Sequence, residues 1–134
     1  MTKKTLKKIL FIDDDIDILS IIKYSLDALE AVTILTSSKG EEGVEIALVE
    51  GPDLIILDVM MPDMDGIEVL KALRLLPNCK NTPVAFLTAK VQKREIEEFI
   101  RLGAIGVLEK PFDPISFPDE ILKLWEKSMG ESTD

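Results

Sequence analysis

The sequence contains no histidine and only one cysteine, Cys79. A single cysteine cannot form a disulfide within the chain, and without histidine the usual zinc sites are excluded. Both features fit a reducing compartment, so we expect a cytoplasmic protein. Long apolar runs are missing as well. The first run ends at Ile12, too early for the core of a signal peptide, and no run is long enough to cross a bilayer, so we expect no membrane segment.

Positive charge is also scarce. The chain has 16 lysine and arginine residues against 25 aspartate and glutamate residues, which gives a net charge of −9. Such a surface repels phosphate backbones and anionic lipids, so we expect no direct binding to nucleic acid or membrane. Where carboxylates cluster, a divalent cation is a natural counter-ion.

The length and the apolar content indicate one domain. With 134 residues, of which 46% are hydrophobic, the chain can bury a core without disulfides or a structural metal. We expect a single domain over residues 1–134, with its core at about 7–129 and a frayed tail at 130–134.

Apolar runs and helical patterns alternate along the chain. The predicted strands are residues 8–12, 31–35, 54–57, 83–87 and 104–108. The predicted helices follow them at 16–29, 40–49, 67–73, 93–102 and 115–129. Strands that read as continuous apolar runs are buried on both faces, which indicates a parallel sheet covered by helices on each side. The predicted fold is therefore α/β, with right-handed crossovers between the strands.

Polar residues stand where these strands end. Asp13 and Asp14 follow the first strand, and Asp58 follows the third. Thr88 follows the fourth, and Lys110 lies close to the end of the fifth. Ligands of open parallel sheets bind beyond the carboxyl ends of the strands, so we expect these side chains to converge. Three carboxylates at one edge repel one another, and bound Mg²⁺ would relieve this repulsion while leaving coordination positions for phosphoryl oxygens. Together with the lysine charge and the threonine hydroxyl, the set suits phosphoryl transfer.

Each of these residues also has an ordinary structural explanation. Asp14 or Asp15 could cap the first helix, and Asp58 could lie in a surface loop. Thr88 could cap the turn that follows it, and Lys110 could be solvated. The joint occurrence of these residue types at successive strand ends favours the chemical interpretation over a coincidence of structural roles.

Four motifs are specific when they are taken together. They lie at Ile9–Asp15, Asp53–Gly66, Pro83–Ala89 and Gly103–Phe112. With them the sequence resembles the CheY-like receiver domain of response regulators in two-component signalling, from about Lys7 to Met129. The resemblance implies a doubly wound, flavodoxin-like fold, with five parallel strands in the order 2-1-3-4-5 and helices on both faces.

The resemblance also implies roles for the strand-end acids. Asp58 matches the phosphoacceptor, which takes a phosphoryl group from the phosphohistidine of a partner kinase. Asp14 matches the acid that binds Mg²⁺ directly, and Asp13 matches the acid that acts through water. Asp58 itself and the backbone carbonyl of Met60 would complete the protein ligands. Met60 and Lys90 occupy positions that flank the expected path of the hydrolytic water.

The two remaining site residues match family residues that contact the phosphoryl group. Thr88 matches the hydroxyl that is drawn toward the phosphoryl group, and Lys110 matches the lysine that pairs with it. The Lys110–Pro111 peptide bond is expected to be cis. Val107 departs from the pattern, because the family usually carries an aromatic residue three positions before this lysine. We therefore expect the fourth and fifth helices and the fifth strand to respond to phosphorylation through Thr88 and the loop after it.

The expected function is that of a response-regulator receiver, a phosphoacceptor signalling domain rather than an enzyme. Its expected partners are a sensor histidine kinase or a histidine phosphotransfer protein, and a downstream protein target. No output domain follows Met129 in this sequence. We therefore expect a stand-alone regulator, with a receiver cut from a longer chain as the alternative.

Two other functions stay open at this point. A phosphohydrolase of the haloacid-dehalogenase type would use Asp13–Asp15 as its nucleophile motif, because it also forms an aspartyl phosphate. Against it, Ile16 and Asp17 do not supply the usual threonine, and Asp58 would have no role. The other alternative is an interaction module that is never phosphorylated. Val107 favours it mildly, whereas the complete set of acids argues against it.

Overall fold

The structure of the protein is a computed structural model that describes residues 5–89 and 92–130. The described strands are β1 (Lys8–Ile12), β2 (Thr33–Ser37), β3 (Leu54–Asp58), β4 (Val84–Thr88) and β5 (Gly106–Glu109). The described helices are α1 (Ile16–Leu26), α2 (Gly40–Glu50), α3 (Gly66–Arg74), α4 (Lys93–Arg101), α5 (Phe117–Ser128) and the short 3₁₀ helix η1 (Pro77–Cys79). Residues 131–134 of the predicted tail lie outside the described residues. No described helix has the length and apolar character that crossing a membrane requires.

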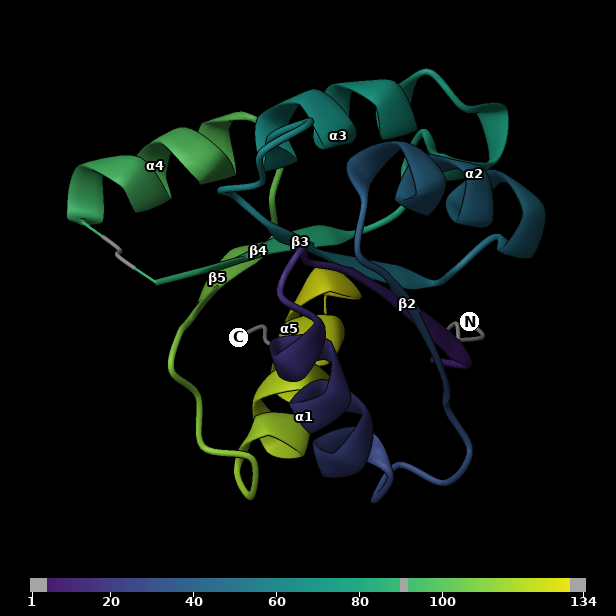
Figure 1. The fold of residues 1–134 in the computed structure, drawn as a ribbon, viewed down its shortest axis with the longest axis vertical. Helices are drawn as coiled ribbons and strands as arrows, with labels where there is room; N and C mark the ends of the chain where they lie inside the picture. Colours follow the sequence, from purple (N-terminus) through teal and green to yellow (C-terminus); the bar gives the residue numbers. More distant parts are fainter. Residues whose placement is uncertain (1–4, 90–91, 131–134) are drawn as a thin grey trace.

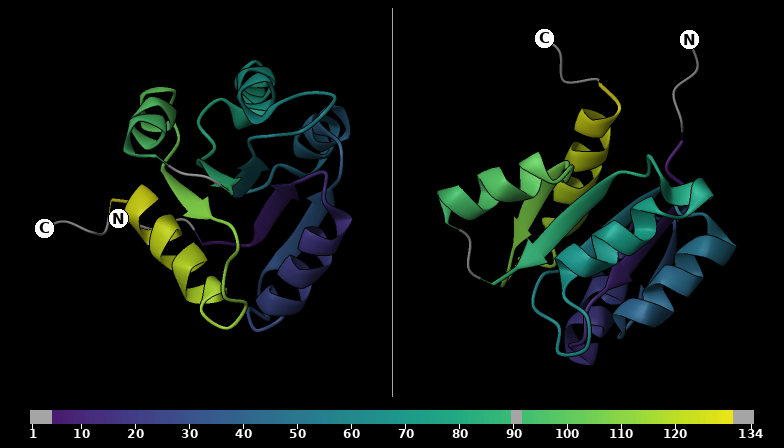
Figure 2. Two further views of the ribbon diagram at one scale, coloured as in Figure 1. Left: turned by 60° about the vertical axis from the view of Figure 1, so that its left-hand side comes forward. Right: turned by 90° about the horizontal axis from the view of Figure 1, so that it is seen from above.

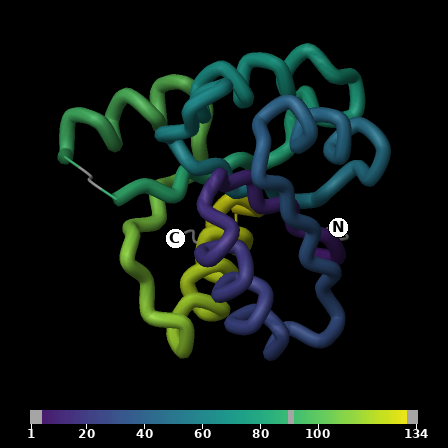
Figure 3. Tube along the Cα trace, in the orientation of Figure 1, coloured from purple at the N-terminus to yellow at the C-terminus, as the bar shows by residue number. Residues whose placement is uncertain are grey.

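The strands form one parallel sheet in the order β2-β1-β3-β4-β5, as the resemblance implies. Helices α2, α3 and α4 cover one face of this sheet, and α1 and α5 cover the other (Figure 1). The Cα trace shows the chain passing from the lower layer at α1 to the upper layer at α2, and returning at α5 (Figure 3). Two further views show the sheet between these helical layers (Figure 2). The prediction of a doubly wound α/β fold is confirmed.

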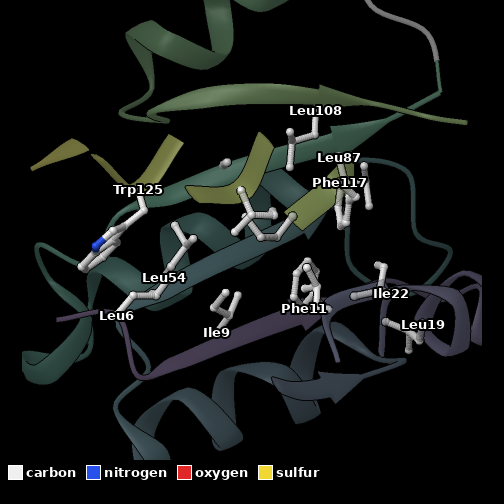
Figure 4. Close-up of a cluster of buried hydrophobic side chains, with 14 residues drawn as sticks. Leu6, Ile9, Phe11, Leu19, Ile22, Leu54, Leu87, Leu108, Phe117 and Trp125 are labelled. Carbon is white, nitrogen blue, oxygen red and sulfur yellow. The ribbon is translucent and has the colours of Figure 1, made fainter. Parts of the chain in front are cut away.

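The side chains of β3 show why this sheet is apolar on both sides. Leu54 and Ile56 belong to a buried cluster between the sheet and helices α1 and α5 (Figure 4). Ile55 and Leu57 belong to a second cluster, which lies beneath α2, α3 and α4. Successive strand residues point to opposite faces, so a strand covered on both sides has no polar position. Each of these side chains is at most 1% exposed, and burying one contributes roughly 1.5–3 kcal/mol of hydrophobic free energy.

The same alternation separates Asp58 from Thr88. In β3, Asp58 continues the series of Ile56, on the side of α1 and α5. In β4, Thr88 continues the series of Phe86, on the side of α2, α3 and α4. Asp58 pairs in register with Leu87, the residue before Thr88. The two residues therefore continue opposite series of their strands, and both lie at the carboxyl edge of the sheet.

Strands β2 and β5 begin two residues later than the apolar pattern predicts. Before β2, the N–H of Val32 donates to the carbonyl of Leu29 at 3.0 Å, which extends the turn after α1. Before β5, the N–H of Ala104 donates to the carbonyl of Phe99 at 3.0 Å, which closes the end of α4. In both places apolar residues belong to a turn, and their sequence alone resembles a strand.

Helices α1 and α3 begin with aspartate caps. Asp15 Oδ1 accepts the N–H groups of Asp17 at 3.0 Å and Ile18 at 3.2 Å, which satisfies donors at the start of α1. Asp65 caps α3 in the same way. The sequence left open whether Asp14 or Asp15 caps the first helix. Asp15 is the cap, and the prediction of this role for Asp14 is wrong.

Candidate functional site

The predicted residues come together at the carboxyl edge of the sheet. A pocket of about 570 Å³ opens there. The predicted residues that line it are Asp14, Asp58, Met60, Thr88 and Lys110. Asp13 joins the group through its contact with Lys110. The convergence expected from the strand-end rule is thus present in the structure.

The three acids form a compact cluster. One carboxylate oxygen each from Asp13, Asp14 and Asp58 lies within 4.8 Å of the other two. Asp13 and Asp58 are buried, whereas Asp14 is exposed. The pKa of Asp58 is raised from 3.8 to about 7, mainly by burial and next by the negative charge of Asp13; a hydrogen bond with Asp14 adds to the rise, and Lys110 opposes it. The cluster therefore holds more negative charge than its surroundings compensate.

Lys110 supplies the positive charge of the site. Its Nζ lies 2.8 Å from Asp13 Oδ2 and 3.5 Å from Asp58 Oδ1. Burial by itself lowers the pKa of Lys110, but its contacts with Asp13 and Asp58 outweigh that effect, so the pKa is raised overall. The ammonium group is consequently charged at neutral pH. The Lys110–Pro111 peptide bond is cis, as expected from the resemblance.

Asp13 still has capacity for a further partner. Its Oδ1 accepts the N–H of Asp15 at 2.9 Å. Its Oδ2 is buried in the ion pair with Lys110, yet among the described residues it receives no hydrogen bond of adequate geometry. An under-satisfied buried carboxylate oxygen is costly, and a hard cation with oxygen ligands relieves this cost. The donor set of the site, which consists of carboxylates, fits Mg²⁺.

Thr88 and Met60 differ strongly in exposure. Thr88 is buried at the end of β4, and its carbonyl accepts the N–H of Lys110 at 2.9 Å. The side chain of Met60 is 77% exposed at the pocket. The predicted role of the Met60 carbonyl as a metal ligand stays a prediction. Lys90, the other predicted neighbour of the water path, lies outside the described residues.

Two residues of α4 also line the pocket, and neither was predicted from the sequence. Glu95 and Phe99 line it together with Asp58 and Thr88. The available signal was their spacing of four residues, which places them on one face of a helix. The sequence does not reveal where α4 packs against the sheet, so it could not place this face of the helix at the pocket.

The comparisons with known proteins agree with this geometry. Residues 9–122 match the family model for the response regulator receiver domain. The chain belongs to this family. The receiver domain is 42% identical over 108 residues to the alkaline phosphatase synthesis transcriptional regulatory protein PhoP of Bacillus subtilis, a match that covers 81% of this chain and 44% of PhoP. It thus spans less than half the length of that relative.

Other relatives are nearer in length. The receiver domain is 35% identical to the probable chemotaxis protein CheY of Rhizobium etli, over 78% of this chain and 81% of that protein. Among solved structures, it is similar to the chemotaxis response regulator CheY4 of Vibrio cholerae, with a TM-score of 0.81 and 32% identity. That likeness covers 90% of this chain and 99% of the other. The implied receiver fold is therefore shown.

Proposed function

We propose that the domain is a phosphorylation switch in which Asp58 accepts a phosphoryl group. The donor is the phosphohistidine of a sensor histidine kinase or of a histidine phosphotransfer protein. The observation that carries this proposal is the position of Asp58, buried at a pocket edge between two further acids and the ammonium group of Lys110. A stable fold does not require such a cluster, whereas phosphoryl transfer does.

The proposed metal is Mg²⁺, held by Asp13, Asp14, Asp58 and the backbone carbonyl of Met60. The exposed carboxylate of Asp14 and the under-satisfied Oδ2 of Asp13 support this ligand set. Bound there, Mg²⁺ supplies positive charge that neutralises the acids and the phosphoryl oxygens.

The transfer itself is a displacement at phosphorus. A carboxylate oxygen of Asp58 forms a bond to phosphorus while the bond to the donor imidazole nitrogen breaks, and the electron pair of that bond stays on the nitrogen. Lys110 pairs with the phosphoryl oxygens, since its Nζ already lies 3.5 Å from Asp58 Oδ1. The hydroxyl of Thr88, in the wall of the same pocket, donates a hydrogen bond to the transferred group.

The signal passes to a downstream protein through a conformational change. The acidic surface of the chain supports a protein partner over nucleic acid or membrane, and a cytoplasmic location suits a kinase-driven switch. The names of the relatives indicate different kinds of target: PhoP is a transcriptional regulatory protein, and CheY is a chemotaxis protein. We favour a protein target, which agrees with the chemotaxis relative.

The test is phosphorylation by acetyl phosphate, followed by intact mass measurement. We expect one added phosphoryl group in the wild type with Mg²⁺, and none with EDTA or in Asp58→Asn. Asp63→Asn is the matched control, because Asp63 is an exposed acid in the same loop and should leave the adduct unchanged. An unmodified wild type would favour the interaction module, and turnover of a small phosphomonoester would favour the hydrolase.

A further inference from the structure

A second pocket lies at the amino edge of the sheet, at the opposite end of the strands from Asp58. Its volume is about 420 Å³. The residues that line it include Arg74 at the end of α3, Thr82 before β4, and Ser128 and Met129 at the end of α5. None of the described residues that line it is acidic, although the chain as a whole has a net charge of −9. This amino-edge pocket therefore carries positive charge on an otherwise acidic protein.

The guanidinium group of Arg74 is held in place by the loop that it closes. Its Nη1 donates to the carbonyl of Cys79 at 3.0 Å and to the carbonyl of Thr82 at 2.7 Å. These bonds use the hydrogens of Nη1, and the N–H groups of Nε and Nη2 donate to no described residue. A fork of N–H donors with a fixed orientation matches the two oxygens of a carboxylate.

Arg74 also has no counter-ion among the described residues. Arg101 pairs with Glu98, and Lys110 pairs with Asp13, whereas no described carboxylate lies within ion-pair distance of Arg74. The side chain of Arg74 is partly buried, and this burial lowers its pKa. A partly buried charge without a partner is unfavourable, so an anion in the amino-edge pocket would stabilise the folded chain.

The sequence supplies carboxylates directly after the part of α5 that lines this pocket. Met129 lines it, and Gly130 follows with a φ of 78°, the left-handed conformation in which helices commonly end. Glu131 comes next and Asp134 three residues later, both outside the described residues. Two residues of chain span at most about 7 Å, so the side chain of Glu131 is within reach of a pocket that Met129 already lines.

We propose that the amino-edge pocket binds a carboxylate through Arg74, and that the segment 131–134 of the same chain supplies it from Glu131 or Asp134. The carboxylate accepts the remaining N–H groups of the guanidinium and neutralises its charge. The contact joins the end of α5 to the loop between α3 and β4, so the terminal segment that the sequence predicts to fray is held at the sheet. The inference goes beyond the proposed function and does not depend on phosphorylation of Asp58.

A double-mutant cycle in the full chain tests this contact. The two changes are Arg74→Gln, which removes the guanidinium charge, and the tail variant Glu131→Gln/Asp134→Asn. Urea unfolding at low salt gives the folding equilibrium constant of each protein. We expect the tail variant to lower this constant about threefold more with Arg74 present than in Arg74→Gln. The difference should disappear in about 1 M NaCl, which screens the pair.

Asp63→Asn/Asp119→Asn is the matched control. It also removes two carboxylates, and both residues are exposed and lie on other parts of the chain. Its effect on the folding equilibrium constant should be the same with Arg74 present and in Arg74→Gln. If the tail variant is equally indifferent to Arg74, the contact between the segment 131–134 and Arg74 does not exist.

Nuclear magnetic resonance with succinate as the probe needs no substitution at Arg74, so it stays decisive if Arg74→Gln does not fold. The Nε–H signal of Arg74 should differ between the wild type and the tail variant, and succinate should shift it in the tail variant. Half-saturation should take about three times more succinate in the wild type, because the segment 131–134 competes for the same site with the free energy that the cycle measures.

The outcomes identify the source of the carboxylate. An equal succinate requirement in the wild type and the tail variant would show that the pocket is filled from solution, which would overturn the segment 131–134 as its ligand. An Arg74 signal that succinate does not move in the tail variant would overturn the carboxylate site itself. Neither result bears on Asp58, whose phosphorylation by acetyl phosphate is measured separately.

Discussion

Gly66 lies directly against the backbone of Asp58. A Cβ atom at Gly66 would come within 2.5 Å of the carbonyl oxygen of Asp58 and within 3.0 Å of the Cα atom of Val59. The N–H of Gly66 also donates to the carbonyl of Val59 at 2.9 Å. The start of α3 is therefore packed onto the loop that carries the proposed phosphoacceptor, and only glycine fits there without a backbone shift.

Gly66→Ala should destabilise the domain by about 1–3 kcal/mol, since the clash is with backbone atoms that cannot rotate away. It should also lower the extent of phosphorylation at Asp58, because the loop must move. Urea unfolding and intact mass measure the two effects. Lys71→Ala, an exposed change on the same helix, should stay within about 0.5 kcal/mol of the wild type. A Gly66→Ala protein of wild-type stability would show that the loop adapts freely.

Stability should depend on pH through Asp58. Its pKa is about 7 in the folded chain against an ordinary value of 3.8, so between these values the folded state binds more protons than the unfolded state. The free energy of unfolding in EDTA should therefore fall as the pH rises from about 4 to about 7, and this contribution should be flat above that range. Asp58→Asn should lack the slope and exceed the wild type at pH 8 by up to about 4 kcal/mol.

Urea unfolding of the wild type, Asp58→Asn and Asp63→Asn in EDTA at several pH values checks this dependence. The exposed Asp63 should leave the slope intact when it is changed. Equal stability of Asp58→Asn and the wild type at pH 8 would mean that the ionised carboxylate of Asp58 does not destabilise the folded state.

Mg²⁺ should stabilise the wild type more at pH 8 than at pH 6, because a proton on Asp58 competes with the cation. At a concentration of about 100 times Kd the gain is about 2.7 kcal/mol. Asp14→Asn should lose most of this gain and still fold, since Asp14 is exposed and does not cap α1. Asp17→Asn, which changes an exposed acid on α1, is the control. Thermal unfolding with and without Mg²⁺ measures the difference, and a gain that survives in Asp14→Asn would place the cation elsewhere.

Met60→Asn should shorten the lifetime of the phosphoryl group on Asp58. The exposed apolar side chain borders the pocket, and replacing it with a polar amide eases the approach of water. We expect up to about a tenfold faster loss, which corresponds to about 1.4 kcal/mol in the barrier. The decay of the phosphorylated mass after removal of acetyl phosphate gives the rate. Ile115→Asn, at another exposed apolar position, should leave it unchanged, and an unaltered lifetime in Met60→Asn would reject the role.

The strands and the acids were predictable because local pattern and sheet geometry decide them. The run Leu54–Leu57 is apolar at every position and ends in Asp58, so both its burial and the location of the carboxylate follow from the sequence. The strand order 2-1-3-4-5 came from the resemblance, since parallel strands with helical crossovers allow other orders. Roles of individual residues at the site stay predictions until the chemistry is measured.

The boundaries of the turns and the residues of α4 that line the pocket were not predictable in the same way. Val32 and Ala104 are apolar residues in hydrogen-bonded turns, and only their backbone partners reveal this. Glu95 and Phe99 acquire their position from the packing of α4 on β4, a contact between segments that the sequence keeps apart. Side chains that depend on such tertiary contacts carry no local signal.

The sheet separates two apolar clusters, and this has an evolutionary consequence. One cluster packs beneath α2, α3 and α4, and the other packs between the sheet and helices α1 and α5. Because side chains in the two clusters do not share partners across the sheet, a substitution in one should have little effect on packing in the other. The two clusters can therefore diverge separately while the fold is kept.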